Sequence, residues 1–133
     1  MRIKIHVTKE DIVKGEYDSG PTDHPLALAI KRNLNIGRSH EVNFDEDDSC
    51  ISNRSSCGDA FPFEVDNRAR KFANNFADLF ERDGISTVKD LMKAINKLRP
   101  FHFFMTVEES EFEDYEISES LISKFTECAA KKD

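Results

Sequence analysis

The chain has 133 residues, a net charge of −7, eleven Phe and no Trp. It is long enough for one folded domain, which we place at residues 1–133 and expect to have a Phe-rich core. Abundant charged residues with only five Gly and four Pro exclude a collagen-like or low-complexity chain. No apolar run reaches the length of a membrane span, and no signal peptide is recognisable.

The first predicted element is a strand over residues 3–7, where apolar and polar residues alternate. Thr8 is a typical N-cap and is followed by acidic residues, so a short helix is expected to run from it to Gly15. After a loop, Asp23 is predicted to cap a second helix with a proline in its first turn. Gly37 is expected to end that helix.

The middle of the chain predicts two strands, a loop and the clearest helix. Residues 42–44 form a short apolar stretch, whereas residues 45–59 are polar, Ser-rich and acidic and indicate a long loop or insertion. Residues 61–65 alternate again, and the proline among them favours an edge strand. Asp66 is a suitable N-cap for a helix with an apolar stripe that ends before Gly84.

The last third predicts a helix, a central strand and a final helix. Ser86 or Thr87 is expected to cap a helix that runs to Leu98. Residues 101–107 are almost continuously apolar, which is typical of a central strand covered on both faces. A final amphipathic helix follows Ser118.

Together these elements predict an α+β fold in a single domain. We expect a small sheet of four or five short strands with amphipathic helices packed on one face. The acidic insertion near 45–59 and an acidic C-terminal extension from residue 108 are predicted additions to that core.

The opening segment resembles a module found in small phage and prophage proteins of unassigned function. The resemblance rests on Val7-Thr8, Ile12 and Gly15, followed by Pro25-Leu26-Ala27-Leu28-Ala29-Ile30. Later segments, Phe61-Pro62-Phe63 and Pro100-Phe101-His102-Phe103, are similar in order and character. His24 stands where these proteins usually carry cysteine. The resemblance implies a phage-encoded protein in the host cytoplasm but implies no activity.

Acidic side chains are concentrated in two blocks. Residues 41–66 carry eight acidic groups and one basic group, and residues 100–133 carry nine acidic groups and three basic ones. The chain as a whole is therefore not expected to bind nucleic acid directly, and a basic partner is expected instead. The residues predicted to contact that partner are Glu108, Glu109, Glu111, Glu113, Asp114, Glu116, Asp45, Glu46, Asp47 and Asp48.

Carboxylates interleaved with aromatic side chains can imitate a phosphate backbone. With the phage resemblance, this pattern predicts a protein that binds and inhibits a host nucleic-acid-handling defence complex, of the anti-CRISPR or another anti-defence type. The structural alternative is that these acidic residues form a solvated edge that prevents pairing with strands of other molecules. A phage accessory protein that forms homo-oligomers is a further alternative.

The other hypothesis is a small enzyme or ligand-binding protein with a site at Asp23-His24. An Asp–His pair at a helix start can perform acid–base chemistry or receive an anion. The alternative is that Asp23 only caps the helix and His24 is a surface residue or part of a hydrophobic staple. Because the sequence has no nucleotide-binding or hydrolase motif, we expect no enzyme activity, no catalytic residue and no cofactor.

Cysteine and histidine residues also raise the question of a metal site. Cys50 and Cys57, with His40 and Asp59 nearby, are spaced more widely than zinc ligands usually are. No metal is therefore expected, and an odd cysteine count favours free thiols, although a Cys50–Cys57 bridge stays open. His6 and His102 lie on predicted strands and are candidates for neighbours in the sheet.

Overall fold

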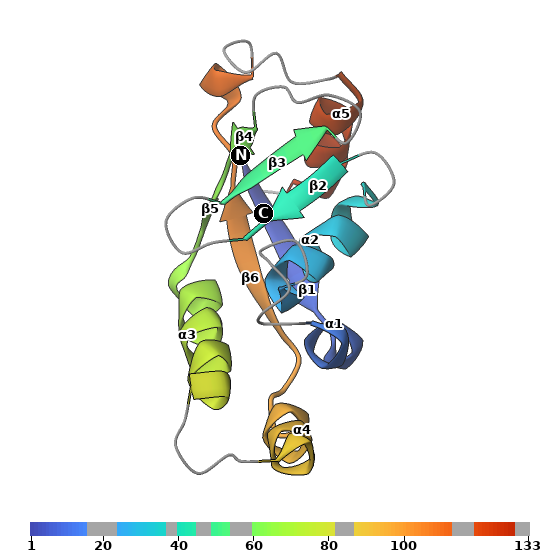
Figure 1. The fold of residues 1–133 in the computed structure, drawn as a ribbon. Coiled ribbons are helices and arrows are strands. Elements are labelled where there is room, and N and C mark those ends of the chain that lie inside the picture. The colour runs from blue at the N-terminus through green and yellow to red at the C-terminus, as the bar shows by residue number, and fades with distance from the viewer. Residues whose placement is uncertain are drawn as a thin grey trace.

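The computed structural model describes seven segments of the chain, namely residues 1–15, 24–36, 40–44, 49–53, 60–81, 87–112 and 119–129. These segments form helices and two three-stranded antiparallel sheets, ordered β1-β6-β5 and β2-β3-β4 (Figure 1). The α+β class is confirmed. The predicted single sheet of four or five strands is wrong, because the six strands within the described segments divide into two sheets. The elements are β1 (Arg2–Val7), α1 (Lys9–Lys14), α2 (Pro25–Leu34), β2 (His40–Asn43), β3 (Cys50–Asn53), β4 (Phe61–Pro62), β5 (Glu64–Val65), α3 (Asn67–Glu81), α4 (Val88–Asn96), β6 (Phe101–Thr106), the 3-10 turn η1 (Glu109–Glu111) and α5 (Glu119–Cys128).

The first sheet joins strands that are far apart in the sequence. β1 pairs with β6 from Arg2 opposite Thr106 to Val7 opposite Phe101, and β5 lies on the other side of β6. Along β1, buried and exposed residues alternate, so one face carries apolar side chains into the core. β6 is the central strand, as predicted. It is not covered on both faces, because alternate residues of β6 are only partly buried.

The second sheet contains a strand within the segment that was expected to be a loop. β3 lies within residues 45–59 and pairs with β2 on one side and β4 on the other. The predicted strand 61–65 is divided between the two sheets: β4 belongs to one and β5 to the other. At the junction the N–H of Phe63 bonds to the carbonyl of Ser49, 3.1 Å away.

The core is rich in phenylalanine, as expected. Phe76, Phe103 and Phe125 are completely buried and come from α3, β6 and α5. Burying a side chain of this size contributes about 2 to 3 kcal/mol relative to leaving it in water. Packing between elements distant in sequence therefore holds this fold together more than helix propensity does.

The predicted helix starts are confirmed for three helices. Thr8 and Asp11 form a reciprocal capping box at α1. Asp66 accepts a hydrogen bond from the N–H of Ala69 at the start of α3, and Thr87 caps α4. The predicted end of α2 at Gly37 is wrong, because Asn35 caps that helix in the left-handed conformation with φ 55°.

Lys9 of α1 connects this helix to the C-terminal end of α4 by hydrogen bonds. The ammonium of Lys9 donates to the carbonyl oxygens of Asn96 and Leu98, the latter 2.8 Å away. These carbonyls lie at the C-terminal end of α4, where a positive charge also meets the negative end of the helix dipole. Figure 1 shows α4 at the opposite end of the molecule from η1 and α5.

Replacing Gly15 with alanine is expected to lower the free energy of unfolding by about 1 to 3 kcal/mol. Gly15 ends α1 with φ −66°, so its backbone does not require glycine. A Cβ at this position would nevertheless lie 2.5 Å from Cδ and 2.8 Å from the backbone N of Pro25, which begins α2. Urea denaturation of the variant measures the loss. Stability equal to that of the wild type would contradict close packing between α1 and α2.

Candidate functional site

The acidic segment after β6 begins with a tight turn. Glu108 precedes η1, and its carbonyl accepts a hydrogen bond from the N–H of Glu111 at 3.1 Å. Three carboxylates thereby fall within one turn, at Glu108, Glu109 and Glu111. The aromatic ring of Phe112 anchors the turn, since it packs against Phe61 and Phe125 with centroids 5.5 and 6.0 Å away.

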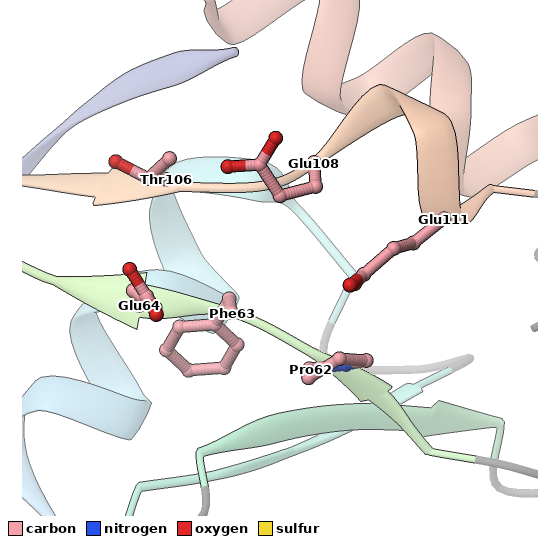
Figure 2. A pocket seen from close by; sticks show the side chains of 6 residues that line it. All are labelled: Pro62, Phe63, Glu64, Thr106, Glu108 and Glu111. Atoms are coloured by element: carbon pink, nitrogen blue, oxygen red, sulfur yellow. The ribbon is translucent and has the colours of Figure 1, made fainter.

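A small open hollow lies between this turn and the β4–β5 segment. It has a volume of about 110 Å³ and contains three carboxylates in its lining. Pairing of β5 with β6 places Glu64 opposite Thr106, at the edge of the hollow. Figure 2 shows the Glu111 side chain reaching from its turn toward Pro62 and Phe63. We call this site the acidic hollow and define it by Pro62, Phe63, Glu64, Thr106, Glu108 and Glu111.

The chemistry of the acidic hollow suits a basic side chain of another protein. Its lining has three carboxylates and no basic residue, so its local potential is negative. Pro62 adds apolar surface, which can receive the methylene stem of a lysine or arginine. In the described part of the chain, no three His, Cys, Asp or Glu residues are grouped so that they could hold a metal ion.

The structure brings together only part of the predicted partner-binding set. Glu108 and Glu111 line the acidic hollow, and Glu109 is exposed beside it. The other predicted residues lie outside the described residues, namely Asp45, Glu46, Asp47, Asp48, Glu113, Asp114 and Glu116. Glu64 was not predicted. Alternation in residues 61–65 indicates that it faces away from the core, but only the pairing with β6 places it beside the acidic turn.

His24 is a structural residue in this fold rather than a surface one. Its Nδ1 accepts a hydrogen bond from the N–H of Leu26 at 3.1 Å and so caps α2. The ring packs against Phe44 and Phe76, with centroids 4.8 and 5.5 Å away. Burial lowers the pKa of His24 from 6.5 to about 4.

The prediction that Asp23 caps α2 is therefore wrong, because His24 is the N-cap, and Asp23 itself lies outside the described residues. A neutral imidazole that already accepts a backbone hydrogen bond has no free lone pair for a substrate proton at that nitrogen. The contacts of His24 thus support its capping role.

The other sequence candidates are separated in space or only partly described. His40 and Cys50 belong to opposite ends of the β2–β3 ladder, since His40 pairs with Asn53 and Cys50 pairs with Asn43. Cys57 and Asp59 lie outside the described residues, the Sγ of Cys50 accepts a hydrogen bond from the side-chain amide of Asn43, and Cys128 is a free thiol. By contrast, His6 and His102 are neighbours as expected, with ring centroids 6.3 Å apart.

Fold and site together define an α+β protein with two antiparallel sheets and an acidic hollow at the end of the central strand. Comparison of this chain with protein-family models, with curated proteins and with solved structures found no match. Among the residues that the structure describes, no helix is both long and apolar enough to cross a bilayer.

Proposed function

We propose that this protein binds a basic surface of another protein through the acidic hollow, and that its partner is a host complex that handles nucleic acid. The observation that supports this proposal most is the meeting of Glu64, Glu108 and Glu111, which come from two separate segments. A site made from separate segments presents a fixed arrangement of charge, unlike a run of acids in a loop. Complexes that hold nucleic acid carry lysine- and arginine-rich grooves that complement such an arrangement.

The inhibitory role is part of the same proposal. A partner groove occupied by carboxylates is closed to phosphates, so binding alone prevents that complex from working. The acidic hollow includes Pro62, which supplies apolar contact that charge pairs at a rim lack. The resemblance of the opening module to phage proteins supports the host complex as the target.

Neutralising the hollow is expected to weaken capture of the partner about tenfold. The test compares the wild type with the triple variant Glu64→Gln, Glu108→Gln and Glu111→Gln in affinity purification from a host lysate, followed by mass spectrometry. The control changes three exposed acids elsewhere by the same charge: Asp78→Asn, Asp90→Asn and Glu127→Gln. The control should retain the partner, and added salt should weaken the wild-type complex.

Two outcomes would contradict the proposal. Equal capture by the wild type and the hollow variant would exclude the acidic hollow as the contact. Equal loss by the hollow and control variants would show that net charge alone matters. Changing Glu113, Asp114 and Glu116 to their amides in the same experiment tests the predicted residues beyond the hollow.

A further inference from the structure

The first sheet has an open outer face opposite the core. β1 places Arg2, Lys4 and His6 on it, and all three are exposed. The register sets each of them beside a partly exposed residue of β6, since Arg2 faces Thr106, Lys4 faces Phe104 and His6 faces His102. We call this surface the outer sheet face and define it by Arg2, Lys4, His6, His102, Phe104 and Thr106.

The charge of the outer sheet face differs from that of the whole chain. Arg68, from the first turn of α3, donates a 3.0 Å hydrogen bond to Nε2 of His102 and adds a third permanent cation to Arg2 and Lys4. Carboxylates also border this surface. The Asp66 carboxylate accepts hydrogen bonds from the backbone N–H groups of Ala69 and Phe104. At the Thr106 end, Glu64 and Glu108 of the acidic hollow lie beside the outer sheet face, so its cationic part is centred on Lys4 and Arg68 rather than on that end.

Aromatic rings lie between these cations. The guanidinium carbon of Arg2 is 4.1 Å from the ring centroid of Phe104, which is a cation–π contact. The rings of His102 and Phe104 are 5.9 Å apart and almost perpendicular. The loss of hydration, together with the nearby charges of Lys4 and Arg68, lowers the pKa of His102, which keeps its ring neutral near pH 7.

We propose that the outer sheet face binds single-stranded nucleic acid. Alternate residues of a strand are about 6.8 Å apart, so Arg2 and Lys4 can meet successive phosphates of an extended strand. Phe104 and His102 then offer ring surfaces against which bases can stack, and neutral rings suit stacking regardless of base identity. An acidic peptide would use the cations but would gain little from the rings.

The net charge of −7 describes the chain as a whole, whereas a partner meets only the face that it touches. The outer sheet face and the acidic hollow adjoin at Thr106, so a complex of protein and nucleic acid could meet both surfaces at once. The proposal does not depend on the acidic hollow binding a protein.

The test measures fluorescence anisotropy of a labelled oligothymidine of about 15 nucleotides at low salt, where phosphate contacts are strongest. The double variant Arg2→Gln, Lys4→Gln is expected to bind at least tenfold more weakly. Its slope of log affinity against log salt should fall by about 1.4, because each lost phosphate contact contributes about 0.7. Phe104→Leu should bind about fivefold more weakly with an unchanged salt slope. The control Lys89→Gln, Lys93→Gln removes the same charge from exposed positions of α4 and should bind within twofold of the wild type.

Several results would overturn the proposal. One is that the wild type does not bind the oligonucleotide. Another is that the control variant loses as much affinity as the double variant. A third is that the wild type binds a blunt duplex as tightly as the single strand. Displacement by polyglutamate at equal affinity, with no effect of Phe104→Leu, would assign the surface to acidic polypeptides instead. Circular dichroism checks the fold of each variant, and Lys4→Gln alone, at an exposed position, replaces the double variant if that one unfolds. The triple glutamine variant of the acidic hollow should keep or raise oligonucleotide affinity, so the two proposals fail separately.

Discussion

Acidification from pH 7 to pH 4 is expected to lower the free energy of unfolding by about 3 kcal/mol through His24 alone. Its pKa is about 4 in the folded protein, because burial disfavours the charged ring, and 6.5 is its ordinary value. Between these two values the unfolded chain binds a proton that the folded protein does not. The contribution of His24 to the free energy of unfolding is therefore fully present above pH 6.5 and is lost as the pH falls toward 4.

Chemical denaturation at a series of pH values between 7 and 4 measures this loss. The matched control is His24→Asn, which keeps a side chain able to cap α2 but has no group that titrates in this range. The variant starts from a lower stability because it loses ring contacts with Phe44 and Phe76. The slope of its unfolding free energy against pH should be much smaller, with a remainder from His40 and His102, whose pKa values are also lowered. Parallel slopes for wild type and variant would contradict the assignment.

Replacing Phe76 with alanine is expected to cost about 3 to 5 kcal/mol of stability. Phe76 is completely buried, and its ring contacts His24, Phe72 and Phe80. Its loss leaves a cavity next to the α2 cap and opens His24 to water. The pKa of His24 should then rise toward 6.5, so the variant should lose pH dependence as well as stability.

The control for this coupling is Phe103→Ala. Phe103 is equally buried, and its ring packs against Phe101 rather than His24. The Phe103→Ala substitution should lower the free energy of unfolding by a similar amount. The slope of that free energy against pH should stay the same as in the wild type. Phe76→Leu gives a milder version if the alanine variant fails to fold. Equal pH slopes in both alanine variants would show that Phe76 does not shield His24.

The sequence predicted helices better than strands, for a physical reason. Each helix satisfies its own backbone, and its caps and apolar stripe are local, so Thr8, Asp66 and Thr87 identify helix starts correctly. Strand β3 has one buried apolar residue, Ile51, inside a polar segment. It is a strand because β2 and β4 supply hydrogen bonds on both sides, and those partners are not visible in its own residues.

The same limit applies to the candidate site. Glu108 and Glu111 were predicted because they belong to one acidic run, but Glu64 joins them only through the pairing of β5 with β6. The cations of β1 were visible as polar positions in an alternating strand. Their position beside Phe104 and His102 depends on a register across the whole chain, which no local pattern encodes.

The pairing of β1 with β6 has a consequence for folding kinetics. The first strand pairs only with a strand that lies about a hundred residues further along the chain. Contacts of such high sequence separation slow folding, because loop closure comes before the stabilising contacts. During synthesis β1 emerges as an unpaired apolar edge long before β6 does, and such edges favour aggregation. Low expression temperature or a chaperone that shields the emerging strand should therefore raise the yield of folded protein.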